Sequence, residues 1–366
     1  MKKYLNSELC LIWLDSFLGL EYKHKQTLYQ LINEKVDIKD LLIKGKDYIV
    51  SEIGEREYST LLGSANAEYL NFVLSTLEKR GITAITVESK EYPESLKNVS
   101  QPPLVIYCKG NIDLLNGNNF SIVGSRKSLP LSINLAKAYA QTLSENGFTI
   151  VTGIAEGVDS AVLEAVIKNG KSAISVIAGG FDNIYPSSNI SLVEKLIKNG
   201  LVISESPPEV KPKPFFFPIR NRIIAGLSKG TLIVSGAIKS GTLYTAEYAE
   251  EYGRDLFAVP YSAGIDVGAG CNDLIKRGAI LTDKPEDILE YYGIEIEERH
   301  KVELTPEQKQ IISVLKDGQV HIEKICSALN KRVFEITPVL AMLEISGIIV
   351  KNGSNFYGLA RVDLEE

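Results

Sequence analysis

The sequence predicts an α/β protein: an extended, doubly wound, Rossmann-like parallel sheet, preceded by a small helical domain and followed by a winged helix. Short apolar β-rich runs alternate with helical stretches from residue 119 to residue 259, which is typical of a parallel sheet covered on both faces. Apolar residues recur at helical spacing before this region, and three helical stretches and a hairpin pattern follow it. We expect a helical domain (1–85), the sheet domain (86–290), a linker (291–304) and the winged helix (305–366).

Length and composition are those of an ordinary globular protein. The 366 residues suffice for two or three domains, and 45% of them are apolar and 23% charged. The net charge of −6 argues mildly against a nucleic-acid partner. Exposed charges are largely screened beyond about 8 Å, however, so a local basic patch counts for more than the total. The four cysteines form no C-x-x-C pair, which favours a reduced, cytoplasmic protein, and no apolar run is long enough to span a membrane.

The first part is predicted to be helical because its apolar residues repeat every three or four positions. A module of the sterile-alpha-motif or helix-hairpin-helix type fits this pattern. Such modules bind nucleic acid or partner proteins, and a plain packing role is the alternative. The residues that carry the pattern are Leu11, Leu14, Leu18, Leu28, Leu31, Ile32, Leu70, Val73, Leu74 and Leu77.

The sheet domain begins with turn signals around one short strand and continues as alternating strands and helices. In a doubly wound sheet, ligands bind outside the carboxyl ends of the strands, so the residues that follow each strand are informative. The predicted strands are 104–107, 120–123, 148–151, 173–177, 201–203, 231–234 and 256–259. The predicted helices are 131–145, 160–168, 191–198, 219–227 and 243–251.

Glycine-rich loops follow several of these strands. Glycines let a backbone approach a ligand closely and offer N–H groups to phosphates. Glycine or serine after a strand is also ordinary turn chemistry, so one such loop means little. Several of them at one sheet edge, with Arg126 and Lys239 among them, indicate a binding site. The loops are Gly124-Ser125-Arg126, Gly179-Gly180 and Lys239-Ser240-Gly241.

A stretch of aromatic and basic residues is the most distinctive motif of the chain. It runs Phe215-Phe216-Phe217-Pro218-Ile219-Arg220-Asn221-Arg222 and continues into an apolar run, with Lys211 and Lys213 before it. Proline suits the first turn of a helix, so Arg220 and Arg222 would lie near a helix N-terminus, where free N–H groups favour anions. Aromatic rings, guanidinium groups and a helix N-terminus together predict a binding site for the bases and phosphates of a nucleic-acid strand. The alternative is a buried aromatic cluster whose arginines pair with carboxylates.

Several enzyme classes lack their signatures here. No G-x-G-x-x-G follows the first strand of the alternating region and no G-x-x-x-x-G-K-[ST] occurs, so dinucleotide binding and Walker-type ATP hydrolysis are not indicated. His24, His300 and His321 all lie outside the sheet domain, so we expect neither a histidine base nor a metal site there, and no cofactor. A carboxylate mechanism stays open, although Asp159 is well placed to cap the following helix. The acids concerned are Glu156, Asp159, Glu205 and Glu247.

The last part begins at Thr305-Pro306, a helix start, after a charged linker. Helices at 307–316, 322–329 and 333–346 precede a hairpin of 348–351 and 356–357, which together predict a winged helix. The third helix would be the recognition helix that enters the major groove of DNA, yet it carries Glu335 and Glu344 and has basic residues only at its start. A structural or protein-contact role is therefore favoured over sequence-specific DNA reading.

Taken in order, the motifs of residues 92–289 resemble the DNA-processing protein A (DprA/Smf) family of bacteria. The stretches that carry the resemblance are Ser121-Ile122-Val123-Gly124-Ser125-Arg126, Gly179-Gly180-Phe181-Asp182, Tyr185-Pro186, Ser204-Glu205, Phe217-Pro218-Ile219-Arg220-Asn221-Arg222, Lys239-Ser240-Gly241-Thr242, Phe257-Ala258-Val259-Pro260 and Gly270-Cys271-Asn272-Asp273.

The resemblance implies a non-enzymatic single-stranded DNA-binding protein with an extended Rossmann fold. It further implies a homodimer, protection of incoming strands in natural transformation, and loading of a RecA-type recombinase, with a single-strand-binding protein as a further partner. The DNA-binding residues we expect are Gly124, Ser125, Arg126, Gly179, Gly180, Lys213, Phe217, Arg220, Asn221, Arg222, Lys239, Ser240 and Gly241.

Four positions depart from the family pattern. Glu156 stands where the family usually has arginine, Leu163 where it has histidine, Ser235-Gly236 where it has Glu-Ala, and Tyr261 where it has glycine. Two other functions compete with strand binding. One is a phosphoribohydrolase-like enzyme that acts on nucleotides through Glu247. The other is a transcription regulator that binds duplex DNA through the winged helix.

Overall fold

The computed structural model describes residues 3–17, 20–30, 38–295, 304–316, 318–345, 348–353 and 355–359. They fall into two compact units, Met1–Ile296 and Glu297–Glu366, which we describe separately. Most of the predicted linker lies outside the described residues, and so do Leu18, Leu31, Ile32 and His300.

A large, mostly parallel sheet forms the centre of the first unit, so the predicted doubly wound α/β fold is confirmed. Its strand order is β1-β2-β6-β5-β4-β3-β7-β8-β9. The seven strands from β6 to β9 run parallel, whereas β1 and β2 at one edge are antiparallel. The strands are β1 (Thr83–Thr86), β2 (Val105–Gly110), β3 (Asn119–Val123), β4 (Thr149–Thr152), β5 (Ala173–Ile177), β6 (Leu201–Ser204), β7 (Gly230–Ile233), β8 (Asp255–Ala258) and β9 (Ile280–Leu281).

The strand order reverses between β3 and β7, which lie side by side although three other strands separate them in the sequence. In an open α/β sheet this reversal leaves a crevice outside the carboxyl ends of the two strands, where ligands bind. The predicted loop Gly124-Ser125-Arg126 begins there, and so does the segment that contains Ser235-Gly236.

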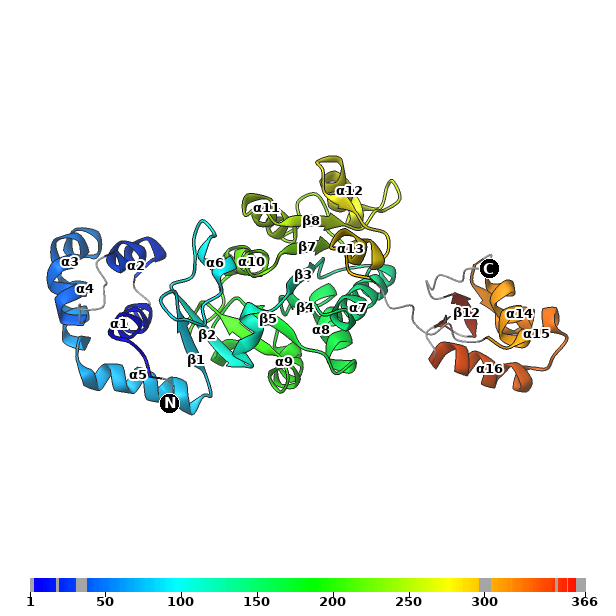
Figure 1. Cartoon of the computed structure of the whole chain (residues 1–366), viewed down its shortest axis with the longest axis horizontal. Helices are drawn as coiled ribbons and strands as arrows, with labels where there is room; N and C mark the ends of the chain where they lie inside the picture. The colour runs from blue at the N-terminus through cyan, green and yellow to red at the C-terminus, as the bar shows by residue number, and fades with distance from the viewer. Residues whose placement is uncertain are drawn as a thin grey trace. The chain divides into compact units, whose positions relative to one another are not determined.

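Helices cover both faces of the sheet (Figure 1). One face packs against α7, α8, α9 and α13, and the other against α6, α10, α11 and α12. Because strand side chains alternate, Ile122 faces the first layer and Val123 the second. The helices are α6 (Glu94–Lys97), α7 (Pro130–Glu145), α8 (Val158–Lys168), α9 (Ile190–Ile197), α10 (Phe216–Leu227), α11 (Leu243–Glu251), α12 (Ala269–Lys276) and α13 (Glu286–Tyr291).

The N-terminal helices pack on the antiparallel edge of the same sheet. The Tyr107 hydroxyl of β2 donates to Asp15 Oδ2 at 2.8 Å, and Lys25 Nζ donates to Asp15 Oδ1 at 2.7 Å. The boundary predicted at 85/86 crosses β1, so a separate domain over 1–85 stays a prediction. The helices are α1 (Asn6–Asp15), α2 (Tyr22–Tyr29), α3 (Ile38–Ile53), α4 (Glu55–Ser64) and α5 (Ala67–Lys79).

The second unit combines three helices with a three-stranded antiparallel sheet of order β10-β12-β11. The predicted hairpin is present, while the short strand β10 was not predicted. The winged-helix assignment itself stays a prediction. The elements are α14 (Pro306–Leu315), β10 (Val320–His321), α15 (Ile322–Leu329), α16 (Val333–Ile345), β11 (Ile349–Asn352) and β12 (Phe356–Leu359).

Candidate nucleic-acid interface

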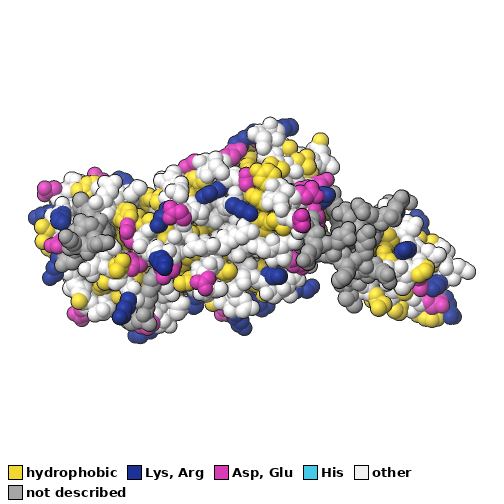
Figure 2. All heavy atoms as spheres, viewed as in Figure 1, with side chains coloured by type: hydrophobic (Ala, Val, Ile, Leu, Met, Phe, Trp, Pro, Cys, Tyr) yellow, Lys and Arg dark blue, Asp and Glu magenta, His cyan; other side chains and the backbone are white. Residues whose placement is uncertain are grey.

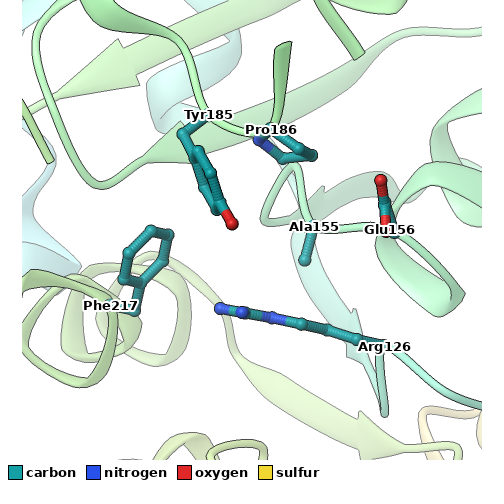
Figure 3. A pocket seen from close by; sticks show the side chains of 6 residues that line it. All are labelled: Arg126, Ala155, Glu156, Tyr185, Pro186 and Phe217. Carbon is teal, nitrogen blue, oxygen red and sulfur yellow. The ribbon is translucent and has the colours of Figure 1, made fainter. Parts of the chain in front are cut away.

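A pocket lies at the carboxyl edge of the sheet, where three loops meet the first turn of α10 (Figure 3). Arg126 comes from the loop after β3, Ala155 and Glu156 from the loop after β4, and Tyr185 and Pro186 from the segment after β5. Phe217 comes from α10. Of the predicted site residues, Arg126 and Phe217 line this pocket.

Arg126 is the exposed cation of the pocket. Its guanidinium carbon lies 5.1 Å from the centroid of the Phe217 ring, a cation–π contact. The part of the chain that the structure describes places no carboxylate within ion-pair distance of this guanidinium. Its charge is therefore free to meet an anion from outside.

Tyr185 completes the aromatic wall, and it was not among the predicted site residues. Its ring lies 5.8 Å from that of Phe217, with the planes 68° apart, and 54% of the residue is exposed. Tyr185-Pro186 was among the motifs that carried the family resemblance, which is the signal that could have identified it. Phe217 is half-buried and Phe215 is 57% exposed. The aromatic cluster is therefore not core.

Arg220 lies beneath the pocket instead of on its surface. Its Nη1 donates to the carbonyl oxygen of Val176 on β5, and 8% of the residue is exposed. Helical periodicity explains this position, because Arg220 shares a face of α10 with Ile224 and Leu227, which pack on the sheet. Burial lowers the pKa of its guanidinium to about 10, and the nearby Asp159 carboxylate opposes this shift.

Arg222 is buried on another side of α10 and pairs with Glu205, which follows β6. Only 3% of it is exposed, and its Nε and Nη1 are buried without a hydrogen-bond partner among the described residues. Asn221 lies between the two arginines: its Oδ1 accepts from Arg220 Nε at 3.2 Å, and its Nδ2 donates to the Gly241 carbonyl at 3.2 Å. These three residues tie α10 to the sheet and to the loop after β7.

Gly179 and Gly180 hold a neighbouring loop instead of presenting open backbone. A Cβ on Gly180 would lie 2.1 Å from the carbonyl oxygen of Pro207, and one on Gly179 would lie 2.8 Å from Pro212 Cδ. The Gly180 N–H already donates to the carbonyl of Val210 at 2.8 Å. Both glycines therefore position the segment that leads to Lys213.

The loop after β3 is held by the start of α8 and by neighbouring loops. A Cβ on Gly124 would lie 2.6 Å from Val158 Cγ2, and Gly157, with a φ of +85°, passes close to the carbonyls of Ser125 and Arg126. The Ser125 N–H donates to Ser235 Oγ at 3.1 Å. Ser235, one of the departures from the family pattern, thus joins the loops after β3 and β7.

Lys213, Lys239, Ser240 and Gly241 lie outside the pocket lining. The two lysines and Gly241 are exposed, whereas Ser240 is half-buried. Lys213 Nζ lies 5.9 Å from the centroid of the Phe215 ring, and Gly241 has open space where a Cβ would point. The two lysines therefore add exposed positive charge on the segments before α10 and after β7.

The four acids considered for catalysis have different surroundings. Glu156 is an exposed residue of the pocket lining, and its Oε1 accepts from the Ser188 hydroxyl at 3.0 Å. Glu205 pairs with Arg222, and Glu247 is exposed on α11. The prediction that Asp159 caps α8 is wrong: Gly157 precedes the helix, and Asp159, in its first turn, accepts from the Ala155 N–H at 3.2 Å. Burial raises the pKa of Asp159, and Arg220 opposes this shift.

Charge on the described surface is mixed. Figure 2 shows Lys and Arg side chains interspersed with Asp and Glu over the face in view. The described residues include no cluster of three or more potential metal ligands, and none of their helices has both the length and the apolar character needed to cross a membrane.

Comparisons with known proteins agree with these observations. The family model described as DNA recombination-mediator protein A matches residues 83–293. The DNA processing protein DprA of Bacillus subtilis is 41% identical over 219 residues, which is 60% of this chain and 74% of that protein.

Two solved structures are similar over most of their own length. DNA processing protein A from Streptococcus pneumoniae superposes with a TM-score of 0.68 at 29% identity, covering 79% of this chain and 98% of that one. The corresponding Helicobacter pylori protein was described for its single-stranded DNA binding mode. It superposes with a TM-score of 0.53 at 29% identity, covering 57% of this chain and 95% of that one. Because the family model spans the whole sheet and its site loops, this chain belongs to the DNA recombination-mediator protein A family.

Proposed function

We propose that this protein binds single-stranded DNA along the carboxyl edge of its sheet. The observation that carries the proposal is the exposed Arg126 guanidinium, which lies over Phe217 in an open pocket and has no ion-pair partner among the described residues. Arginine neutralises phosphates, and an aromatic face stacks on any base, so the combination suits a strand of any sequence. The exposed Lys213 and Lys239 extend this surface beyond the pocket.

The wider role comes from relatives. The Helicobacter pylori relative binds single-stranded DNA. By this likeness and the family resemblance, we infer that the chain acts in the cytoplasm as a homodimer in DNA uptake. It would protect incoming strands and load a RecA-type recombinase onto them, with a single-strand-binding protein as a further partner.

We further propose that the protein is not an enzyme. Of the candidate acids, Asp159 is engaged with backbone and Arg220, and Glu205 with Arg222. The competing hydrolase function is tested by incubating the protein with nucleoside monophosphates and measuring free base. Base release that Glu247→Gln abolishes would overturn the non-enzymatic assignment.

Fluorescence anisotropy with a labelled oligo-dT and the matching duplex tests strand binding. We expect a clear preference for the single strand, and a loss of about tenfold in affinity in Arg126→Ala, as for one charge-assisted contact. Arg277→Ala is the matched control, because Arg277 is an exposed arginine of the same unit that pairs with Glu250 outside the pocket. Equal binding to duplex, or unchanged binding by Arg126→Ala, would contradict the proposal.

Recombinase loading needs its own assay. A RecA-type recombinase hydrolyses ATP when it assembles on a strand. Adding this protein to the recombinase and a strand coated with single-strand-binding protein should therefore raise the rate of ATP hydrolysis. An unchanged rate would leave strand binding in place and remove the loading role.

A further inference from the structure

Glu156 gives the pocket an acceptor that the proposed strand-binding role does not use. In Figure 3 its carboxylate lies beside Pro186, at the end of the pocket away from Phe217. The Ser188 hydroxyl donates to Oε1 at 3.0 Å, and no described residue donates to Oε2, so this oxygen can accept from a ligand. Glu156 is exposed, so a ligand in the pocket can reach this oxygen.

The charges around the pocket differ between its two ends. Arg126 and Phe217 offer a cation and a ring at one end, which suits phosphate and base face. At the other end Glu156 places an exposed carboxylate, whereas the buried Asp159 interacts with both Arg220 and Arg126 and adds no charge of its own to that end. A phosphate at that end would face Glu156 and be repelled, whereas an amino group on a base edge would be attracted.

Resting on the proposed strand binding, we propose that Glu156 reads the edge of one nucleobase and makes the pocket prefer bases that carry an exocyclic amino group. A carboxylate can only accept hydrogen bonds, and in proteins glutamate and aspartate accept from the N4 amino group of cytosine. Uracil and thymine present a carbonyl oxygen at the same position, which a carboxylate repels. The strand would therefore bind without a strict sequence but with a bias at one base.

Cytosine and uracil make the sharpest probe, because their rings have the same size and differ at the amino or carbonyl group. We would compare labelled oligo-dC and oligo-dU of equal length by anisotropy, at slightly alkaline pH where dC strands stay unfolded. We expect oligo-dC to bind about tenfold more tightly, as for one added hydrogen bond to a charged group.

Glu156→Gln is the test variant, because an amide keeps the size of the side chain and can donate as well as accept. We expect it to reduce the dC-to-dU ratio to about one. Glu164→Gln is the control: it removes the same charge from the exposed surface of α8, where Glu164 lies 3.7 Å from Lys137 Nζ. It should leave the ratio unchanged.

The outcomes separate the two proposals. Equal binding of both strands by the wild type, or the same ratio in Glu156→Gln, would overturn base reading and leave strand binding intact. If Glu156→Gln binds both strands more tightly at an unchanged dC-to-dU ratio, Glu156 only repels the strand. That result would also overturn base reading. No binding of either strand would overturn the proposed function, and base reading with it.

Discussion

Three arginines predicted to meet DNA occupy two different regions of the molecule. Arg126 lies on the rim of the pocket, exposed and in cation–π contact with Phe217, whereas Arg220 and Arg222 are buried in the layer beneath it. The buried pair hold α10 through the Val176 carbonyl and through Glu205. The two arginines of the aromatic–arginine stretch thus have structural partners, whereas its rings are accessible and their predicted role in binding a strand stays a prediction.

The comparison shows that a basic residue in a suggestive motif can serve the scaffold as readily as the ligand. What separates the two regions is the helix period. Arg220 has apolar residues four and seven positions later on the same face, so that face turns to the sheet. Arg126 precedes α7 on a loop, where no such face directs it inward.

The largest expected effect concerns the buried layer. Arg222→Ala should lower the free energy of unfolding by about 3 kcal/mol, since it leaves Glu205 without its buried partner. Urea denaturation measures this loss, and Arg277→Ala, which removes an exposed pair, should cost at most about 1 kcal/mol. If Arg222→Ala is as stable as the wild type but binds the strand more weakly, Arg222 contacts DNA and is not a structural residue.

The glycines allow the same comparison. Gly180→Ala should cost about 1–3 kcal/mol in the free energy of unfolding, because a Cβ would meet the Pro207 and Pro208 carbonyls. Gly241→Ala, which adds a Cβ to open space, should stay within about 0.5 kcal/mol. Equal effects in denaturation would show that Gly180 is not a packing glycine.

Phe217→Ala tests the rim by binding. Losing a stacked base should weaken binding of oligo-dT by about 1–3 kcal/mol, measured by anisotropy. Phe215→Ala is the control, because Phe215 is exposed but does not line the pocket, and it should lose less. If the two variants lose the same affinity, the pocket is not where the base stacks.

The smallest expected effect is the change in protein stability when Arg126, at the rim of the pocket, is replaced. Arg126→Ala should change the free energy of unfolding by no more than about 0.5 kcal/mol, because Arg126 is exposed. The same variant should lower the slope of log affinity against log salt by about 0.7, as one phosphate contact on a single strand requires. A marked loss of stability would place Arg126 with the buried arginines.

Local patterns in the sequence determined most of the elements. The predicted ranges 173–177 and 243–251 coincide with β5 and α11, and the other predicted strands of the parallel sheet lie within one or two residues of the observed ones. Side-chain periodicity and turn residues are properties of neighbouring positions, so they can be read without a partner. The same is true of the start of α10 around Pro218 and of the motifs that indicated the family.

Tertiary structure alone decided the partners. The strand β1 was missed because its four residues form a strand by pairing with β2. Tyr185 joins Phe217, Arg220 reaches Val176 and Gly180 fits under Pro207 through contacts between segments far apart in the chain. The helix period can indicate that Arg220 turns toward the sheet, but it does not say which group Arg220 meets there. That partner, the Val176 carbonyl, comes from a segment far away in the chain and is therefore a property of the assembled layers.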